Sequence, residues 1–166
     1  DKSIEKFDLL NSINNYNIVF PIASSKPLNA LIVKKIKERS SSNLIVASDS
    51  LVKNVFKNIE VDWDAVEKEK NPKTKQMMQP YLANLKKRGD ELFQIKFGLV
   101  RLRRYLTNFI KFKDDTDARI FRAITGGNVL LVDDTIGEGT TLKETVKLIQ
   151  KYNPNTLHAY MFIRDY

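Results

Sequence analysis

The sequence contains no cysteine and a single histidine among its 166 residues. A chain without cysteine forms no disulfide framework and offers no thiolate ligand to a metal, which fits a reducing cytoplasm. Its apolar runs are short, and none approaches the about 20 residues that span a membrane. The first six residues lack the apolar core of a signal peptide. We therefore expect a cytoplasmic protein without a membrane segment, in which His158 is a strand residue rather than a catalyst.

The length predicts one domain over residues 1–166. A hydrophobic content of 42% and a charged content of 29% are typical of a soluble globular protein. Positive charge is uneven, because residues 68–122 hold fifteen Lys and Arg against six Asp and Glu, while the rest of the chain is nearly neutral. This basic block could bind nucleic acid through counterion release, could attract a polyanionic small substrate, or could be a solvated helical surface.

Strand and helix patterns alternate at both ends of the chain. Helical periodicity is expected at residues 4–13 and 28–39, and strands are expected at residues 18–22, 44–47, 129–132 and 156–162. A strand-helix-strand order favours parallel pairing with a right-handed crossover. The fold class that we predict is α/β, with a mostly parallel sheet and helices on both of its faces.

The middle of the chain is polar and basic. Residues 70–76 are its most loop-like part, and residues 76–87 show helical spacing. Residues 92–112 interleave aromatic and basic side chains, with apolar residues at helical spacing at Leu99, Leu102, Leu106 and Phe109. We expect an amphipathic helix that buries its aromatic face, and stacking of these rings on nucleic acid bases is the alternative. Residues 58–113 are predicted to form a helical, mobile hood inserted into the domain.

The most informative segment begins with the apolar run Val129–Val132, which is typical of a strand buried on both faces. Asp133 and Asp134 follow it directly. Two carboxylates at the carboxyl end of a strand can accept hydrogen bonds from vicinal hydroxyls, or help to hold Mg²⁺. The alternative is a solvated strand end.

A glycine loop and a helix come next. Gly137 and Gly139 form the loop, and Thr141 with Glu144 has the spacing of a capping box at the start of a helix. Backbone N–H groups and the positive end of a helix dipole can hold a phosphate. Separately, the glycines could serve only a tight turn, and the threonine could be only a cap. Taken together and in this order, the features predict a phosphate site beside ribose or metal chemistry.

This segment resembles the phosphoribosyl-pyrophosphate signature of type I phosphoribosyltransferases, in which an apolar strand and two acidic residues precede Thr-Thr-Gly-x-Thr. The matching positions are Asp133, Asp134, Gly139 and Thr141. Gly137 and Glu138 depart from the pattern, since a threonine usually stands where Glu138 is. The resemblance implies transfer of phosphoribose from 5-phosphoribosyl 1-pyrophosphate (PRPP) to a nitrogenous base, with release of pyrophosphate and with Mg²⁺ as cofactor.

The resemblance also implies roles for individual residues. Asp133, Asp134 and Lys75 would be catalytic, and the two carboxylates would hold the metal directly or through water. The PRPP-binding residues would be Thr135, Gly137, Glu138, Gly139, Thr140 and Thr141.

Within the type I family the early part of the chain looks most like the ComF-like branch, because Pro21 ends a strand and Lys26 precedes Asn29 and a helix. That likeness implies a pyrophosphate loop made of Ala23, Ser24, Ser25 and Lys26. The expected partners are PRPP and a base acceptor, with a homodimer and nucleic acid as further alternatives. Two other functions stay open: a non-catalytic sensor of a phosphorylated ribose, and a nucleic-acid-binding module that uses residues 68–122.

Overall fold

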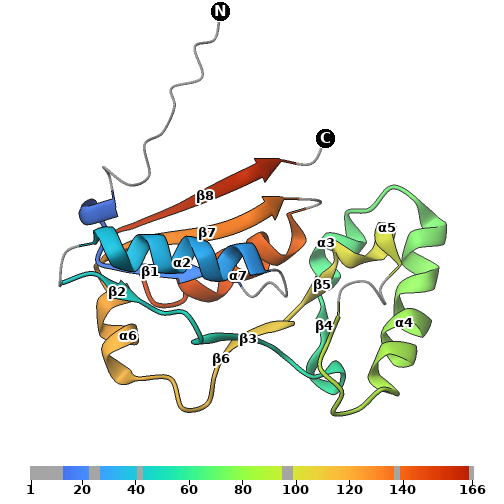
Figure 1. Cartoon of the computed structure of the whole chain (residues 1–166). Coiled ribbons are helices and arrows are strands. Elements are labelled where there is room, and N and C mark those ends of the chain that lie inside the picture. The colour runs from blue at the N-terminus through green and yellow to red at the C-terminus, as the bar shows by residue number, and fades with distance from the viewer. Residues whose placement is uncertain (1–12, 23–26, 41–42, 95–98, 137–138, 165–166) are drawn as a thin grey trace, which may run out of the picture.

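The computed structural model describes residues 13–22, 27–40, 43–94, 99–136 and 139–164 (Figure 1). Its centre is a four-stranded sheet in the order β2-β1-β7-β8. All three pairings are parallel, which confirms the predicted mostly parallel sheet. The strands are β1 (Ile18–Pro21), β2 (Ile45–Val46), β7 (Asn128–Ile136) and β8 (Thr156–Arg164).

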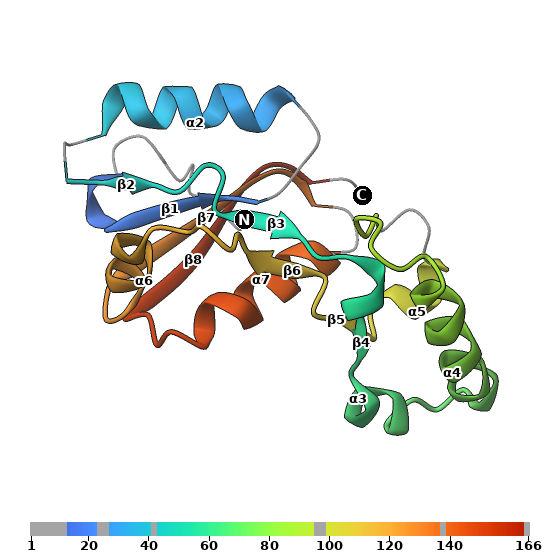
Figure 2. The same ribbon diagram turned by 90° about the horizontal axis from the view of Figure 1, so that it is seen from below.

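Helices cover both faces of the sheet because β1 and β7 are apolar at every position of their paired segment. Successive side chains of a strand point to opposite faces, so such a strand needs a cover on each side. On one face Ile32 and Ile36 of α2 (Pro27–Arg39) pack in a cluster with Ile13, Val19, Leu130 and Val132. On the other face α6 (Ala118–Ile124) and α7 (Thr140–Gln150) share a cluster with Ile18, Phe20, Val129 and Leu131. The predicted layering is confirmed (Figures 1 and 2).

Between β2 and α6 the chain builds a side lobe, defined as residues 54–109, beside the sheet (Figures 1 and 2). It is joined to the sheet by the antiparallel pair β3 (Leu51–Lys53) and β6 (Ile110–Phe112). A second antiparallel pair, β4 (Glu60–Val61) with β5 (Leu106–Thr107), lies within it. Its helical elements are η2 (Phe56–Asn58), α3 (Trp63–Glu67), α4 (Pro72–Lys86) and α5 (Val100–Arg103). The lobe occupies nearly the range predicted for the hood, and the predicted mobility of the hood stays a prediction.

The predicted loop at residues 70–76 is wrong, because α4 begins at Pro72. The side chain of Asn71 caps this helix by accepting the Lys73 N–H at 3.0 Å. Proline suits the first helical position, where no intrahelical hydrogen bond is lost. Thr74, Met78 and Leu85 are the buried residues of α4 and anchor it in the lobe.

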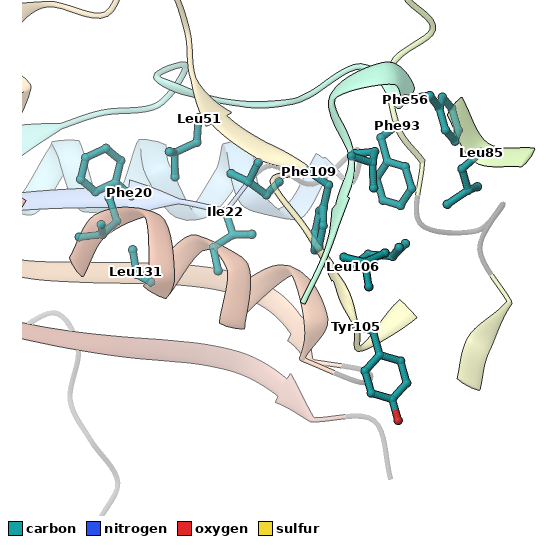
Figure 3. Packing of buried hydrophobic residues seen from close by; sticks show 14 of the residues in the cluster. Phe20, Ile22, Leu51, Phe56, Leu85, Phe93, Tyr105, Leu106, Phe109 and Leu131 are labelled. Carbon is teal, nitrogen blue, oxygen red and sulfur yellow. The ribbon is translucent and has the colours of Figure 1, made fainter. Parts of the chain in front are cut away.

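The predicted amphipathic helix over residues 92–112 is also wrong. That stretch forms the four-residue α5, then β5 and β6, and Asn108 between the two strands has a left-handed φ of +61°. Burial is confirmed for Phe93, Tyr105 and Phe109, while Phe97 lies outside the described residues. Phe93 lies 5.3 Å from Phe56 and 5.3 Å from Phe109 between ring centroids (Figure 3). These rings are covered by one another, so they offer no faces for stacking on nucleic acid bases.

The N-terminal helix predicted at residues 4–13 lies outside the described residues, apart from Ile13 in η1 (Ile13–Asn15). His158 lies in β8, as predicted, and its Nδ1 is 3.0 Å from the Tyr16 hydroxyl. Within the described part of the chain, no helix combines the length and the apolar character needed to cross a membrane.

Candidate functional site

The carboxyl end of β7 projects beyond its neighbour β1. Their pairing ends with Pro21 opposite Val132, whose carbonyl accepts the Ile22 N–H at 2.8 Å. β7 continues to Ile136 because its pairing with β8 continues that far. The acidic pair therefore lies inside the strand, and the predicted strand end at Val132 is wrong. Asp133, partly exposed, is the first residue past β1, at the edge where parallel sheets place their ligands.

The start of α7 is set by Gly139, which has φ +68° and ψ 10° in the left-handed region. The Lys143 N–H donates to the Gly139 carbonyl at 2.9 Å. Lys143 is the first residue of α7 whose N–H bonds within the helix, so the N–H groups of Thr140, Thr141 and Leu142 have no acceptor within the helix. Together with the dipole of an eleven-residue helix, they form an arrangement suited to an anion.

The predicted capping box is wrong, because the helix begins two residues earlier than a cap at Thr141 implies, and Gly139 occupies the cap position. The carbonyl of Thr141 accepts the Thr145 hydroxyl at 3.0 Å. Glu144 is buried, and its carboxylate accepts the backbone N–H of Asn108 from the side lobe. Burial raises the pKa of Glu144 above its ordinary value. This glutamate therefore ties α7 to the side lobe instead of closing its own helix start.

Other residues of the predicted phosphate site are described in part. Thr140 is 8% exposed at the first position of α7, and the backbone of Asp134 and Thr135 belongs to β7. The predicted site residues outside the described part of the chain are Gly137, Glu138 and the pyrophosphate loop Ala23, Ser24, Ser25 and Lys26.

Lys75 is placed in the side lobe, on α4. Its Nζ donates to the Glu67 carbonyl at 2.5 Å and is 3.6 Å from the Glu67 carboxylate. In both views α4 stands at the outer end of the lobe, away from β7 (Figures 1 and 2). The structure thus does not bring Lys75 to Asp133, and its catalytic role stays a prediction.

A hollow that the sequence did not reveal lies between α5 and α7, with a volume of about 390 Å³. We call it the basic pocket, and its described lining is Arg101, Arg104, Leu106, Thr140, Lys143, Glu144 and Lys147. The available signal was the polar stripe of α7 at positions 140, 143, 144 and 147, which recurs at helical spacing beside the apolar stripe. Nothing in the sequence pairs that stripe with the arginines of α5.

Comparison with known families decides the identity of this architecture. Residues 45–165 match the family model of the phosphoribosyl transferase domain. The matched range contains β7, α7 and the whole side lobe. This chain belongs to that family.

Two individual proteins show the extent of the similarity. The phosphoribosyltransferase domain-containing protein 1 of Homo sapiens is 30% identical over 83 residues, which cover 46% of this chain and 35% of that protein. The chain thus spans about a third of that relative's length. A solved structure of the allosteric regulatory enzyme of purine biosynthesis aligns with 93% of this chain and 23% of its own, at 14% identity and a TM-score of 0.43. Membership of the ComF-like branch stays a prediction.

Proposed function

We propose that this phosphoribosyl transferase domain binds PRPP where β7 leads into α7, and transfers its phosphoribosyl group to a nitrogenous base. One observation supports this most: Asp133 lies just past the end of β1, on the strand that leads to the left-handed Gly139 and to the first amides of α7, which have no acceptor within the helix. A carboxylate and an anion cradle thus meet at one edge of the sheet, as a phosphorylated ribose requires.

Each part of the site has a chemical task. The N–H groups of Thr140 and Thr141 donate to the 5′-phosphate, and the dipole of α7 favours its negative charge. Asp133 accepts hydrogen bonds from ribose hydroxyls and, as an anion, stabilises the positive charge that develops on the sugar. These contacts fix the ribose while leaving its anomeric carbon open to the acceptor.

In the proposed reaction the bond between the anomeric carbon and the pyrophosphate oxygen breaks, and pyrophosphate departs with the electron pair. A nitrogen lone pair of the base forms the new bond to the same carbon. The nitrogen then loses its proton to solvent or to a neighbouring base. Exclusion of water protects the electron-poor sugar from hydrolysis.

The carboxyl edge of the sheet suits Mg²⁺ that is held jointly by the protein and by the substrate. Within the described residues, no group of three or more His, Cys, Asp or Glu is placed to hold a metal. Mg²⁺ is commonly bound by one or two carboxylates together with substrate phosphates and water. Asp133 would therefore hold Mg²⁺ that is also bound to PRPP, and the ion would offset the charge of the pyrophosphate.

Calorimetry with PRPP and Mg²⁺ tests the binding step, and an assay for released pyrophosphate across candidate bases tests the transfer. Asp133→Asn should weaken PRPP binding by about tenfold or more, since hydrogen bonds to charged groups contribute about 1.5–3 kcal/mol. The matched control is Asp115→Asn, an aspartate that is 74% exposed beside Lys113. Equal affinity of the wild type and Asp133→Asn would refute this site.

A second function, a non-catalytic sensor, is favoured by Glu138, a carboxylate where the family usually has threonine. The same two measurements separate the functions. Tight PRPP binding without pyrophosphate release for any base would identify the sensor, whereas release that depends on one base would identify the transferase.

A further inference from the structure

We infer that the basic pocket is a second anion site, which binds a phosphate or pyrophosphate group of a small ligand between Arg101 of α5 and Lys143 of α7. The inference does not rest on the proposed transfer reaction. It starts from the lining, in which four cations converge from two separate elements onto one hollow.

The four cations differ in their existing partners. Arg104 is 2.5 Å from the Glu69 carboxylate, and Lys147 is 3.4 Å from the Asp62 carboxylate. Arg101 contacts the Met77 sulfur at 2.9 Å, and none of the ion pairs found among the described residues includes Arg101 or Lys143. These two side chains can therefore accept an anion without breaking an ion pair of the described structure.

Glu144 is the one acidic residue of the described lining. Its carboxylate accepts the Asn108 N–H from the side lobe, and the described lining holds four cations against this one acid. The net charge presented to a ligand is therefore positive, even though Arg104 and Lys147 are paired.

The shape and chemistry of the pocket specify the ligand class. A guanidinium offers a planar fork that matches two oxygens of a phosphate, and an ammonium adds a compact charge. Thr140 adds a hydroxyl at the first turn of α7, and Leu106 gives the hollow an apolar wall. A volume of about 390 Å³ lies in the range of roughly 300–1,000 Å³ found for small-molecule sites.

The basic pocket shares Thr140 with the proposed PRPP cradle but extends away from it along α7. Its positions on α7 run from 140 to 147, two turns down the flank of the helix, and none of the described lining belongs to β7. A further hollow of about 320 Å³ continues along the same flank and shares Glu144 and Lys147 with it. A bound anion would therefore bridge the side lobe and α7 without contact to β7.

The test uses the full chain, labelled with ¹⁵N and titrated with inorganic pyrophosphate in the absence of Mg²⁺. We expect chemical-shift changes at the amides of residues 143–147 and at the Arg101 side chain. The double variant Arg101→Gln/Lys143→Gln should weaken pyrophosphate binding by at least tenfold. Gly139→Ala, which disturbs the cradle N–H groups at the start of α7, should change it by less than twofold.

The matched control is Lys87→Gln/Arg122→Gln, which removes the same two charges from exposed positions outside the lining. Equal losses in the pocket variant and the control would reduce the effect to net charge and overturn the inference. Loss of binding in Gly139→Ala would place the pyrophosphate in the PRPP cradle and overturn the inference as well. Thermal unfolding of each variant, monitored by circular dichroism, confirms that the fold is intact, and PRPP calorimetry tests the proposed function independently.

Discussion

The start of α7 allows a sharp test because Gly139 adopts a backbone conformation that other residues avoid, with φ +68°. An L residue in the left-handed conformation costs roughly 1–2 kcal/mol. Replacing glycine by alanine also restricts the unfolded chain, which offsets about 0.4–1 kcal/mol of that cost. Gly139→Ala should therefore lower the free energy of unfolding by about 1 kcal/mol, measured by urea denaturation.

The functional consequence of Gly139→Ala is larger than its effect on stability if the first turn relaxes. A relaxed turn moves the N–H groups of Thr140 and Thr141 away from a bound 5′-phosphate. We expect PRPP affinity to fall by up to about tenfold, which corresponds to ~1.4 kcal/mol. Gly139→Asn should retain more affinity, because asparagine visits the left-handed region more readily than alanine.

Gly126 supplies the matched control, since it has the same φ of +68° and a Cβ added there would meet no atom within 4 Å. Gly126→Ala should lose a similar amount of stability and bind PRPP like the wild type. If Gly139→Ala is destabilised but binds PRPP as tightly as Gly126→Ala, the start of α7 is not part of the PRPP site, and the reasoning fails.

Three further predictions concern other parts of the chain. Burial raises the pKa of Glu144, so as the pH rises above the ordinary glutamate value of 4.5 this group ionises in the unfolded state before it does in the folded state. The free energy of unfolding therefore falls with pH until the folded-state pKa is passed. Urea unfolding at pH 4–8 should show this fall in the wild type and not in Glu144→Gln. Phe93→Ala should lower the free energy of unfolding by about 3–5 kcal/mol, because the Phe93 side chain is 1% exposed. Leu92→Ala is the control, since Leu92 is 61% exposed, and it should change the free energy of unfolding by less than about 0.5 kcal/mol. Glu138→Thr, at a position outside the described residues, should bind PRPP about tenfold more tightly in calorimetry, since it removes a carboxylate that would repel a phosphate; weaker binding would show that Glu138 contributes to the site.

The sheet and its covering helices could be predicted because the pattern of apolar residues in each element matches the faces that the element buries. Val129–Val132 is apolar at every position, as a strand between two helical layers must be, and each of these residues is buried. The apolar stripe of α7 likewise packs against the sheet through Leu142, Val146 and Ile149. The parallel order of the strands then placed the candidate site at the carboxyl edge of the sheet. The length of β7 could not be predicted, because β7 continues past Val132 only through its pairing with β8.

The side lobe could not be predicted, since its signals permit two solutions. Pro72 reads as a helix breaker in a polar stretch, yet with Asn71 before it the same residue starts a helix. The spacing of Leu99, Leu102, Leu106 and Phe109 suits one long helix, but the left-handed backbone at Asn108 turns the chain into a strand pair instead. Leu102, Leu106 and Phe109 are buried in one core, as a single helix would also have placed them, but two of the three lie in or beside the strand pair.

The contacts of Asn108 explain why the lobe and the site have to be understood together. Its side chain donates to the Asn58 carbonyl at 2.9 Å, its carbonyl accepts the Asn54 side chain at 2.9 Å, and its N–H is bound by Glu144. Glu144 lies on the helix whose first turn forms the proposed phosphate cradle. A shift of the lobe would therefore either move α7 or break a buried hydrogen bond to a carboxylate, which costs more than a bond between neutral groups. The sequence spacing that first indicated a helix cap at Thr141 and Glu144 thus belongs to a tether between the side lobe and the site.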